Sequence, residues 1–273
     1  MVKLKKKNKL LDCITFFDNN FMFQTRYNIL VDHIDYFIVC ESLFDHKGNK
    51  KKQNFIWKDE YNKDKIKYFL LEKPFPKNTD PWKNQAIQRE FLLSCTDFAD
   101  NEDYIFFSDP DEIVRPELLT NFELTNKYGI FLMDCFNYRF NLFNPYESPW
   151  EGTRVAKKKN LKSIDFLRQK IKSKNLNYNF YRLDKERNIK LFNNGGWHFN
   201  NIMSPKEISI KLKTFAHSEF SDEKFANEEV IKSKINNYLD LFERGHKYKK
   251  IELNNSFPEF IIQNKEKFNK WIL

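Results

Sequence analysis

Glycine is scarce in this chain, which has six glycines among 273 residues. The phosphate loop of P-loop proteins, the GxGxxG turn of dinucleotide-binding folds and the GxSxG elbow of α/β-hydrolases all depend on closely spaced glycines. None of these patterns occurs in the sequence. The sequence therefore excludes the kinase, P-loop and dinucleotide-binding classes of protein.

Cysteine is also rare, and the four residues form neither a CxxC pair nor a cluster with histidine: Cys13, Cys40, Cys95 and Cys135. Zinc sites and small disulfide frameworks require closely spaced ligands or pairs. We therefore expect free thiols and no zinc site. Free thiols are typical of a reducing compartment, so the expected location is the cytoplasm, or the host cytoplasm if the protein is viral.

Long apolar runs are missing as well. No stretch approaches the roughly 20 apolar residues that cross a bilayer. The basic first residues precede an apolar stretch that Asp12 and Asp18 interrupt, which does not match a signal peptide. We expect a soluble protein without a transmembrane segment.

What the sequence does contain predicts a folded, basic protein. Hydrophobic residues make up 41% of the chain and aromatic residues 17%, which is enough to form a core. Lysine and arginine outnumber aspartate and glutamate by 47 to 38, and this net charge of +9 favours an anionic partner. No linker divides the chain, so we expect one domain over 1–273, with a basic tail at 1–8 and a helical C-terminal extension at about 222–273.

Alternating strand and helix patterns predict an α/β fold. The first three elements are a strand at 12–17, a helix at 21–31 and a strand at 36–40, which form a βαβ unit. Further strands are predicted at 68–71, 104–107 and 130–136, and the turn residues at 193–199 lead into a short strand. Further helices are predicted at 82–98, from Arg115 to just before Gly129, at 163–173 and from Ser204. Such units give a mostly parallel central sheet flanked by helices, with ligands at the carboxyl ends of the strands.

The strongest candidate for chemistry is Asp109-Pro110-Asp111, which follows the predicted strand at 104–107. Residues two apart in an extended chain point to the same side, and Pro110 favours the extended conformation at Asp109. Both carboxylates can therefore face one divalent cation that bridges to a diphosphate and neutralises the charge on a leaving phosphate. The alternative is that the two aspartates only cap a turn.

Two more residues fit a nucleotide diphosphate. Glu41 ends the second predicted strand, where its carboxylate can accept hydrogen bonds from a ribose or a uracil N–H. Arg89 lies on the helix before the acidic motif, and its guanidinium suits phosphate oxygens. Taken singly, each residue is also explained by an ordinary surface ion pair. Their position at one edge of the predicted sheet favours the nucleotide.

Histidines mark two further places. His198 follows the glycines at 195–196, where the backbone can approach a ligand, and its imidazole could complete a metal site. A packed histidine explains this position equally well. Trp197 could form a stacking floor for a sugar ring. His217 and Glu219 bring an imidazole and a carboxylate near each other, and either could act as a base.

Several of these segments occur in the order found in one enzyme family. They are 12–17 with Arg26, 37–42, Arg89 with 108–113, 195–198, Lys211 with 214–219, and 240–244. On these segments the sequence resembles glycosyltransferase family 17, the β-1,4-N-acetylglucosaminyltransferase III-like proteins, from about residue 12 onward. The resemblance implies a GT-A type nucleotide-sugar-binding fold and an inverting, metal-dependent transfer of a sugar from a UDP-sugar, UDP-N-acetylglucosamine in the characterised relatives.

The resemblance also implies roles for the donor side of the site. Asp109 and Asp111 match the acidic pair that holds Mn²⁺ or Mg²⁺, and His198 is the further metal ligand. Glu41 and Arg89, together with Asp109, contact the nucleotide.

An inverting transfer needs a carboxylate that removes the proton of the acceptor hydroxyl. The expected base is Glu219, with Asp134 and Glu147 as alternatives. Trp197 and His217 are expected to contact the acceptor, which is a polysaccharide or a lipid-linked or protein-linked glycan on the cytoplasmic side.

A second class of function stays open: a basic nucleic-acid- or glycan-binding module that keeps the fold without catalysis. RNA-module signatures are missing, and the basic residues do not concentrate in one element. We therefore expect no nucleic-acid partner.

Overall fold

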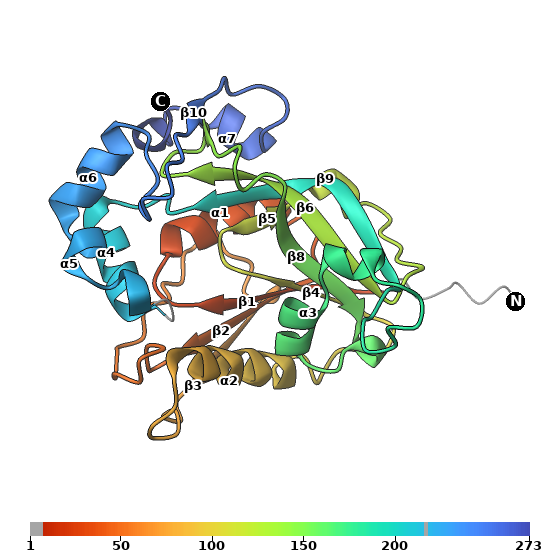
Figure 1. Cartoon of the computed structure of the whole chain (residues 1–273). Helices are drawn as coiled ribbons and strands as arrows, with labels where there is room; N and C mark the ends of the chain where they lie inside the picture. Colours follow the sequence, from red (N-terminus) through yellow and green to blue (C-terminus); the bar gives the residue numbers. More distant parts are fainter. Residues whose placement is uncertain (1–7, 216–217) are drawn as a thin grey trace, which may run out of the picture.

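The computed structural model describes residues 8–215 and 218–273 and has a mixed α/β architecture built around one ten-stranded sheet (Figure 1). Its strands are β1 (Leu10–Phe16), β2 (Tyr36–Ser42), β3 (Ile66–Leu71), β4 (Tyr104–Ser108), β5 (Glu112–Val114), β6 (Tyr128–Asn137), β7 (Leu142–Phe143), β8 (Trp150–Lys157), β9 (Ile189–Asn200) and β10 (Lys249–Lys250). The α-helices are α1 (Asn20–Leu30), α2 (Pro81–Ser94), α3 (Ile164–Lys170), α4 (Pro205–Thr214), α5 (Glu223–Ala226), α6 (Glu228–Asn236) and α7 (Glu259–Gln263). The short 3₁₀ helices are η1 (Pro116–Leu118), η2 (Lys158–Asn160), η3 (Ser173–Asn177), η4 (Ser218–Phe220) and η5 (Asn269–Trp271).

The sheet has a parallel half and a mostly antiparallel half. β3, β2, β1 and β4 are neighbours and run parallel, with Phe16 beside Glu41 and Ile14 beside Ser108. β8 pairs antiparallel with β4 and β6, and β5, β7 and β10 also pair antiparallel, whereas β9 runs parallel to β6. The prediction of a mostly parallel sheet is correct for the first half. It is wrong for the second, where β6, β7 and β8 follow one another through short connections without a crossover helix.

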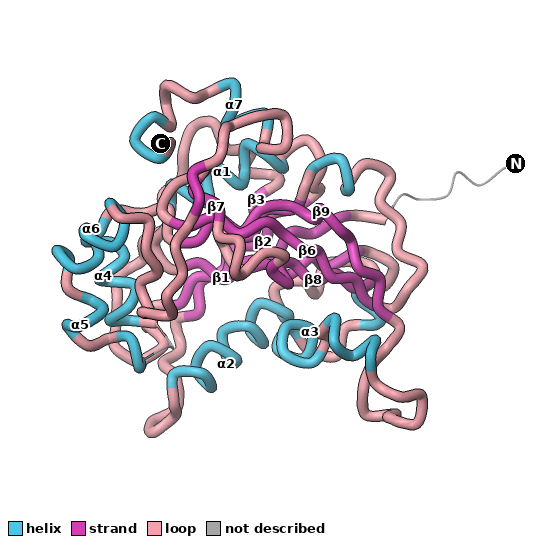
Figure 2. Tube along the Cα trace, turned by 45° about the horizontal axis from the view of Figure 1, so that its top comes forward, coloured by secondary structure: helices cyan, strands magenta, loops and turns pink. Residues whose placement is uncertain are grey.

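Alternation along the parallel strands explains why helices cover both faces. In β1, Leu10, Ile14 and Phe16 point into one core, while Leu11 and Cys13 point into the other. β2 and β4 alternate in the same way. Helices α1 and α7 pack on the first core, and α2 and α3 pack on the second (Figures 1 and 2). Because both faces are apolar, the polar chemistry gathers at the strand ends.

Helices α4, α5 and α6 lie together beside the carboxyl ends of the parallel strands (Figure 1). α4, α5 and α6 pack around a third apolar cluster that includes Ile208, Leu212 and Ile231. α4 begins with the capping box predicted at Ser204.

Within residues 8–215 and 218–273, no helix is both long enough and apolar enough to cross a membrane.

The structure differs from the prediction at 115–129. Residues Pro116–Leu118 form one 3₁₀ turn, and the chain then continues without a helix to β6. Leu119, Phe122 and Leu124 are buried in the first core. Their apolar spacing therefore reflects an irregular segment that packs under the sheet, and not an amphipathic helix.

Candidate active site

A cavity of about 880 Å³ lies at the carboxyl ends of the parallel strands. Its volume is within the range of small-molecule sites, about 300–1,000 Å³. The segment after β1, the end of β2 and the motif after β4 contribute Asp18, Ser42, Asp109 and Asp111 to the lining, and α2, α3, α4 and β9 contribute further side chains. The edge of the sheet that the sequence predicted to bind ligand is therefore hollow.

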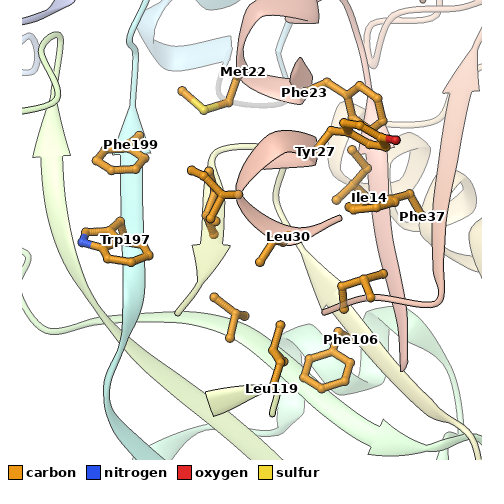
Figure 3. Packing of buried hydrophobic residues seen from close by; sticks show 14 of the residues in the cluster. Ile14, Met22, Phe23, Tyr27, Leu30, Phe37, Phe106, Leu119, Trp197 and Phe199 are labelled. Atoms are coloured by element: carbon orange, nitrogen blue, oxygen red, sulfur yellow. The ribbon is translucent and has the colours of Figure 1, made fainter. Parts of the chain in front are cut away.

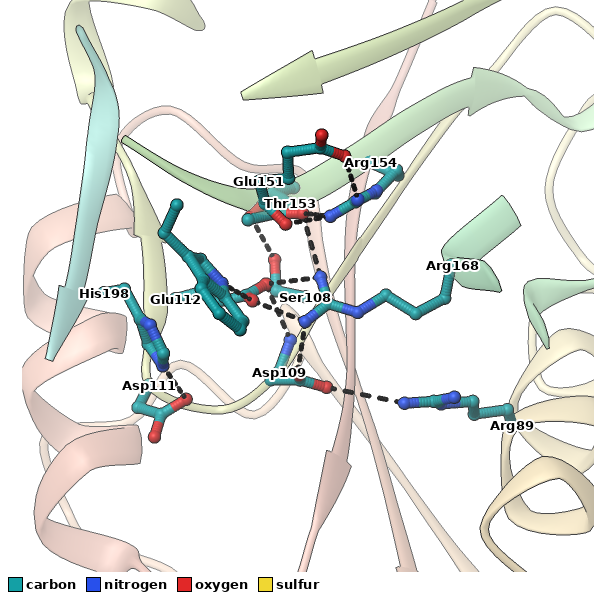
Figure 4. A network of polar contacts seen from close by, with 12 residues as sticks. Arg89, Ser108, Asp109, Asp111, Glu112, Glu151, Thr153, Arg154, Arg168 and His198 are labelled. Carbon is teal, nitrogen blue, oxygen red and sulfur yellow. Dashed lines mark hydrogen bonds and ion pairs between the residues drawn. The ribbon is translucent and has the colours of Figure 1, made fainter. Parts of the chain in front are cut away.

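Asp109 is held by arginines from two helices (Figure 4). Arg168 of α3 donates from Nη2 to Oδ2 of Asp109, and Nη2 of Arg89 in α2 is 4.0 Å from Oδ1. Arg89 also donates to Asp165 at 3.1 Å. Burial alone would raise the pKa of Asp109, but the charges of Arg168 and then Arg89 lower it overall. The protein itself thus already balances the charge of Asp109.

Glu112 connects the acidic motif to the arginine. Its carboxylate is fully buried and accepts hydrogen bonds from both terminal nitrogens of Arg168, at 2.7 and 3.3 Å. It also accepts from Nε1 of Trp150 at 2.7 Å and from the backbone N–H of Asp109 at 3.1 Å. A buried ion pair persists when its remaining polar atoms are satisfied, as they are here. The pair of Glu112 and Arg168 therefore fixes the conformation of the motif.

Asp111 faces β9 and α4, on the side of the motif away from the two arginines that contact Asp109 (Figure 4). Its Oδ1 is 3.5 Å from Nε2 of His198, and its Oδ2 is 3.7 Å from Nζ of Lys211. Burial alone would raise the pKa of Asp111, but the charges of His198 and then Lys211 lower it. Both distances exceed those of good hydrogen bonds. Asp111 is therefore balanced by charge without being clamped.

His198 lies between Asp111 and the interior. Its Nδ1 is 3.6 Å from Sγ of Cys135, and its ring centroid is 4.8 Å from that of Trp150. Burial lowers the pKa of His198, but Cys135 and Asp111 raise it, and the result is well above the usual value. Burial also raises the pKa of the Cys135 thiol. Asp111, whose Oδ1 is 3.5 Å away, is therefore the carboxylate that favours the protonated form of the imidazole.

The fit to a divalent cation is limited. Among the described residues, no group of three or more His, Cys, Asp or Glu side chains is arranged to hold a metal ion. Asp109 is tied to Arg168, and the neighbouring Asp111 favours the protonated form of His198, which cannot bind a metal through Nε2. Mg²⁺ is commonly bound by one or two carboxylates together with water and substrate phosphates. The residues fit a cation that Asp111 shares with a bound diphosphate, and they do not fit a site made of protein ligands alone.

Glu41 is outside the cavity, so its expected contact with the nucleotide is wrong. Its fully buried carboxylate accepts hydrogen bonds from the backbone N–H groups of Asn54 and Phe55 at 2.7 and 3.0 Å. The hydroxyl of Tyr68 donates to it at 2.9 Å, and Lys51 forms an ion pair with it. The carboxylate oxygens of Glu41 are therefore already used in hydrogen bonds to residues 54–55, and they hold this stretch between β2 and β3 against the sheet.

Trp197 and Asp134 also lie outside the cavity lining. Trp197 is buried beside Phe199 in the first core (Figure 3), and its Nε1 donates to the carbonyl oxygen of Ser256 at 3.0 Å. Asp134 is the neighbour of Trp197 in the register of β6 and β9, and burial raises its pKa while Arg115 lowers it. The expected sugar contact of Trp197 is wrong because its ring faces the core, and Asp134 does not reach the cavity as a base.

Of the three carboxylates considered as bases, Glu147 is the one that lines the cavity. Its Oε1 accepts a hydrogen bond from Arg244 at 2.7 Å, and its Oε2 accepts one from Asn144 at 2.8 Å. Glu219 lies exposed in η4 and is not part of the lining. His217 lies outside the described residues.

The glycines at 195–196 serve strand packing. Gly196 has φ +145°, and a Cβ there would lie 2.0 Å from the carbonyl oxygen of Ile113 in β5. A Cβ on Gly195 would lie 2.8 Å from the backbone nitrogen of Leu132 in β6. The close approach expected between this backbone and a ligand is therefore an approach between β9 and its two neighbouring strands.

Sequence reasoning missed three polar residues that shape the site. Asp18 lines the cavity, and burial raises its pKa. Its position after the first predicted strand is a signal that could identify it. Glu112 and Arg168 form the buried pair described above. Arg168 is 59 positions from Asp109 in the sequence, so no local pattern connects the two.

Comparison with known proteins assigns the chain to a family. No curated protein gives a significant match. Residues 2–271 match glycosyltransferase family 17, which is essentially the whole chain and confirms the resemblance carried by its segments. The chain therefore belongs to glycosyltransferase family 17 and is an enzyme that transfers a glycosyl group from a nucleotide-sugar to a glycan acceptor.

Proposed function

We propose that the enzyme transfers N-acetylglucosamine from UDP-N-acetylglucosamine to a hydroxyl group of a glycan, with inversion at the anomeric carbon and with Mn²⁺ or Mg²⁺. The observation that carries this proposal is that Asp109 and Asp111 line one cavity at the exit of β4, among arginine and lysine side chains. A departing diphosphate needs positive charge at that place.

The nucleotide is proposed to lie along the parallel half of the sheet. Phe17 and Asp18 after β1, Ser42 at the end of β2 and Gln88 of α2 line this part of the cavity. The carboxylate of Asp18 would accept a hydrogen bond from the uracil or the ribose, the role first expected of Glu41. A group that binds in this way must lie at the cavity surface, and Asp18 does.

The diphosphate is proposed to lie beside Asp109 and Asp111 in the cavity. Arg89 and Lys211 line the cavity on either side of it, and their charges complement phosphate oxygens. A bound Mn²⁺ or Mg²⁺ would supply Lewis-acid stabilisation of the leaving diphosphate. Asp111 is the proposed protein ligand, and His198 could join it only after losing its proton, which makes binding pH-dependent.

Glu147 is the proposed general base. The acceptor oxygen forms its bond to the anomeric carbon from the face opposite the diphosphate, while the bond to the phosphate oxygen breaks. Glu147 takes the hydroxyl proton in this step, and Arg244 and Asn144 orient its carboxylate.

The proposal includes a GT-A type fold in a single domain over residues 1–273. The parallel order β3-β2-β1-β4, with the acidic motif directly after β4, supports it. Residues from about 222 onward, which include α5, α6 and α7, are proposed as a helical C-terminal extension.

Release of UDP from UDP-N-acetylglucosamine tests the function. We expect release that requires Mn²⁺ or Mg²⁺, stops with a chelator and rises with a suitable glycan acceptor. UDP should raise the melting temperature only when the cation is present, because a ligand of the native state stabilises it. Absence of release from every UDP-sugar tried, with polyanion binding unchanged in D111A, would instead support a binding module without catalysis.

A further inference from the structure

The loop at 178–185 presents apolar side chains to water. Leu183 is 92% exposed, Phe180 is 83% exposed and Tyr181 is 64% exposed. These are the most exposed large apolar side chains among the described residues. They are consecutive apart from Arg182, so they form one apolar tip, which is unlike the scattered apolar residues of an ordinary surface.

Polar contacts inside the loop hold this tip outward. Arg182 donates to both carboxylate oxygens of Asp184, at 2.7 and 2.8 Å. The charged groups of Arg182 and Lys185 lie over the ring of Tyr178, 5.2 and 5.5 Å from its centroid. The loop thus folds its charges onto its own ring and leaves its apolar side chains in solvent.

The segment around the tip is strongly basic. Residues 170–190 contain seven basic and two acidic residues, so this segment carries +5 of the chain's net charge of +9. Asp184 pairs with Arg182 and Lys185, and Glu186 pairs with Lys127. These basic residues are spread over the end of α3, η3, the loop and the start of β9, so they form a basic segment without concentrating in one element.

The same segment borders the active-site cavity. Lys172 and Lys174 line the cavity, and η3, which contains Lys174, leads directly into the loop. In Figure 1 the chain passes from α3 through this stretch to β9. The loop therefore follows, within a few residues of the chain, a stretch that lines the cavity.

We propose that the loop at 178–185 docks the enzyme on an anionic lipid surface. Phe180 and Leu183 enter the head-group layer, and the exposed basic residues Arg187 and Lys190 face anionic head groups. A protein partner fits less well. Three side chains offer roughly 150–250 Å² each, whereas a stable protein interface removes about 800 Å² from each partner. This docking goes beyond the proposed function.

Vesicle binding tests the proposal. The probes are vesicles of phosphatidylcholine, with or without about one third phosphatidylglycerol. We expect the full chain to sediment with the anionic vesicles and less well at high salt. F180S/L183S should bind at least about tenfold more weakly, and R187Q/K190Q should lose several-fold in affinity for the anionic vesicles. I56S is the matched control, because Ile56 is 58% exposed elsewhere on the surface, and it should bind like the wild type.

Two outcomes overturn the proposal. One is equal vesicle binding, or no binding, by the wild type and F180S/L183S, with both proteins folded by circular dichroism. The other is a dimer in solution that F180S/L183S dissociates without any binding to lipid. UDP release measured without vesicles should be the same for both proteins, so a failure of docking leaves the proposed function untouched.

Discussion

Two aspartates of one tripeptide lie in different electrostatic surroundings. Asp109 contacts Arg168, which is itself fixed by Glu112, while Asp111 has His198 and Lys211 at 3.5 and 3.7 Å. An arginine stays protonated and binds through a rigid fork, whereas lysine has a flexible stem and histidine can lose its proton. The difference indicates a division of roles. The Asp109 side fixes the motif, and the Asp111 side can exchange its partners for a ligand.

The strongest test of this comparison is the substitution D111N. It removes the carboxylate that is free to bind a cation and leaves the arginine side intact. We expect a loss of about 1,000-fold in kcat/KM for UDP release, which corresponds to about 4 kcal/mol, with the protein still folded. Steady-state kinetics and thermal melting measure the two quantities. An enzyme that keeps its activity in D111N would remove the basis for separating the two sides.

The second test is the substitution E112Q, which changes the Asp109 side of the motif. An amide cannot balance the buried guanidinium of Arg168, and a buried charge without its partner is costly. We expect the free energy of unfolding to fall by about 3 kcal/mol, measured by urea denaturation. D184N is the matched control, because Asp184 also pairs with an arginine, Arg182, but both side chains of that pair are exposed, at 56% and 43%. It should cost far less, because water screens an exposed pair, and an equal loss in both variants would contradict the special role of Glu112.

The parallel half of the sheet could be predicted because its signals are local. The strands β1, β2 and β4 are short apolar runs whose two faces are both buried, so each one is visible in a few residues. β9 was predicted only as a short strand near 199, yet it spans Ile189–Asn200. Its first half mixes apolar and polar residues without a regular alternation, and its pairing with β6 depends on contacts between distant parts of the chain.

The candidate site divides in the same way. Asp109, Asp111 and Arg89 were identified from strand ends and helix faces, and the structure places them around one cavity. Glu41 and Trp197 occupy positions that look equally exposed in sequence, but their partners come from other segments and bury them. Whether a polar residue faces a cavity or serves the interior depends on such long-range partners, which a single sequence does not reveal.

We expect a smaller effect from the substitution K211M, which changes the Asp111 side of the motif. Lys211 is 3.7 Å from Asp111 and donates to Asn201 at 2.8 Å, and we propose that it turns to the diphosphate when the donor binds. Loss of one charged contact should raise KM for UDP-N-acetylglucosamine about tenfold, with little change in kcat. K213M is the control on the same helix, since Lys213 pairs with Glu223 at 2.8 Å at the surface. A fall in kcat alone would show that Lys211 acts in the chemical step.

We expect the smallest effect from the substitution D134N, because Asp134 belongs to neither the Asp109 side nor the Asp111 side of the motif. Burial raises the pKa of Asp134, so the folded protein holds the proton more tightly than the unfolded chain does. Between the unfolded pKa and the raised folded pKa, stability therefore falls as pH rises, and the cost of burying the charge is complete above that window. Asparagine carries no charge, so D134N should be more stable than the wild type at pH 7, by less than about 1 kcal/mol because the group is partly solvated. This advantage should shrink as pH falls through the raised folded pKa and vanish below the unfolded value of about 4, while UDP release stays unchanged. Urea denaturation of both proteins at several pH values measures the difference in the free energy of unfolding. If D134N stays more stable than the wild type at low pH, or loses activity at pH 7, Asp134 acts through something other than the cost of burying its charge.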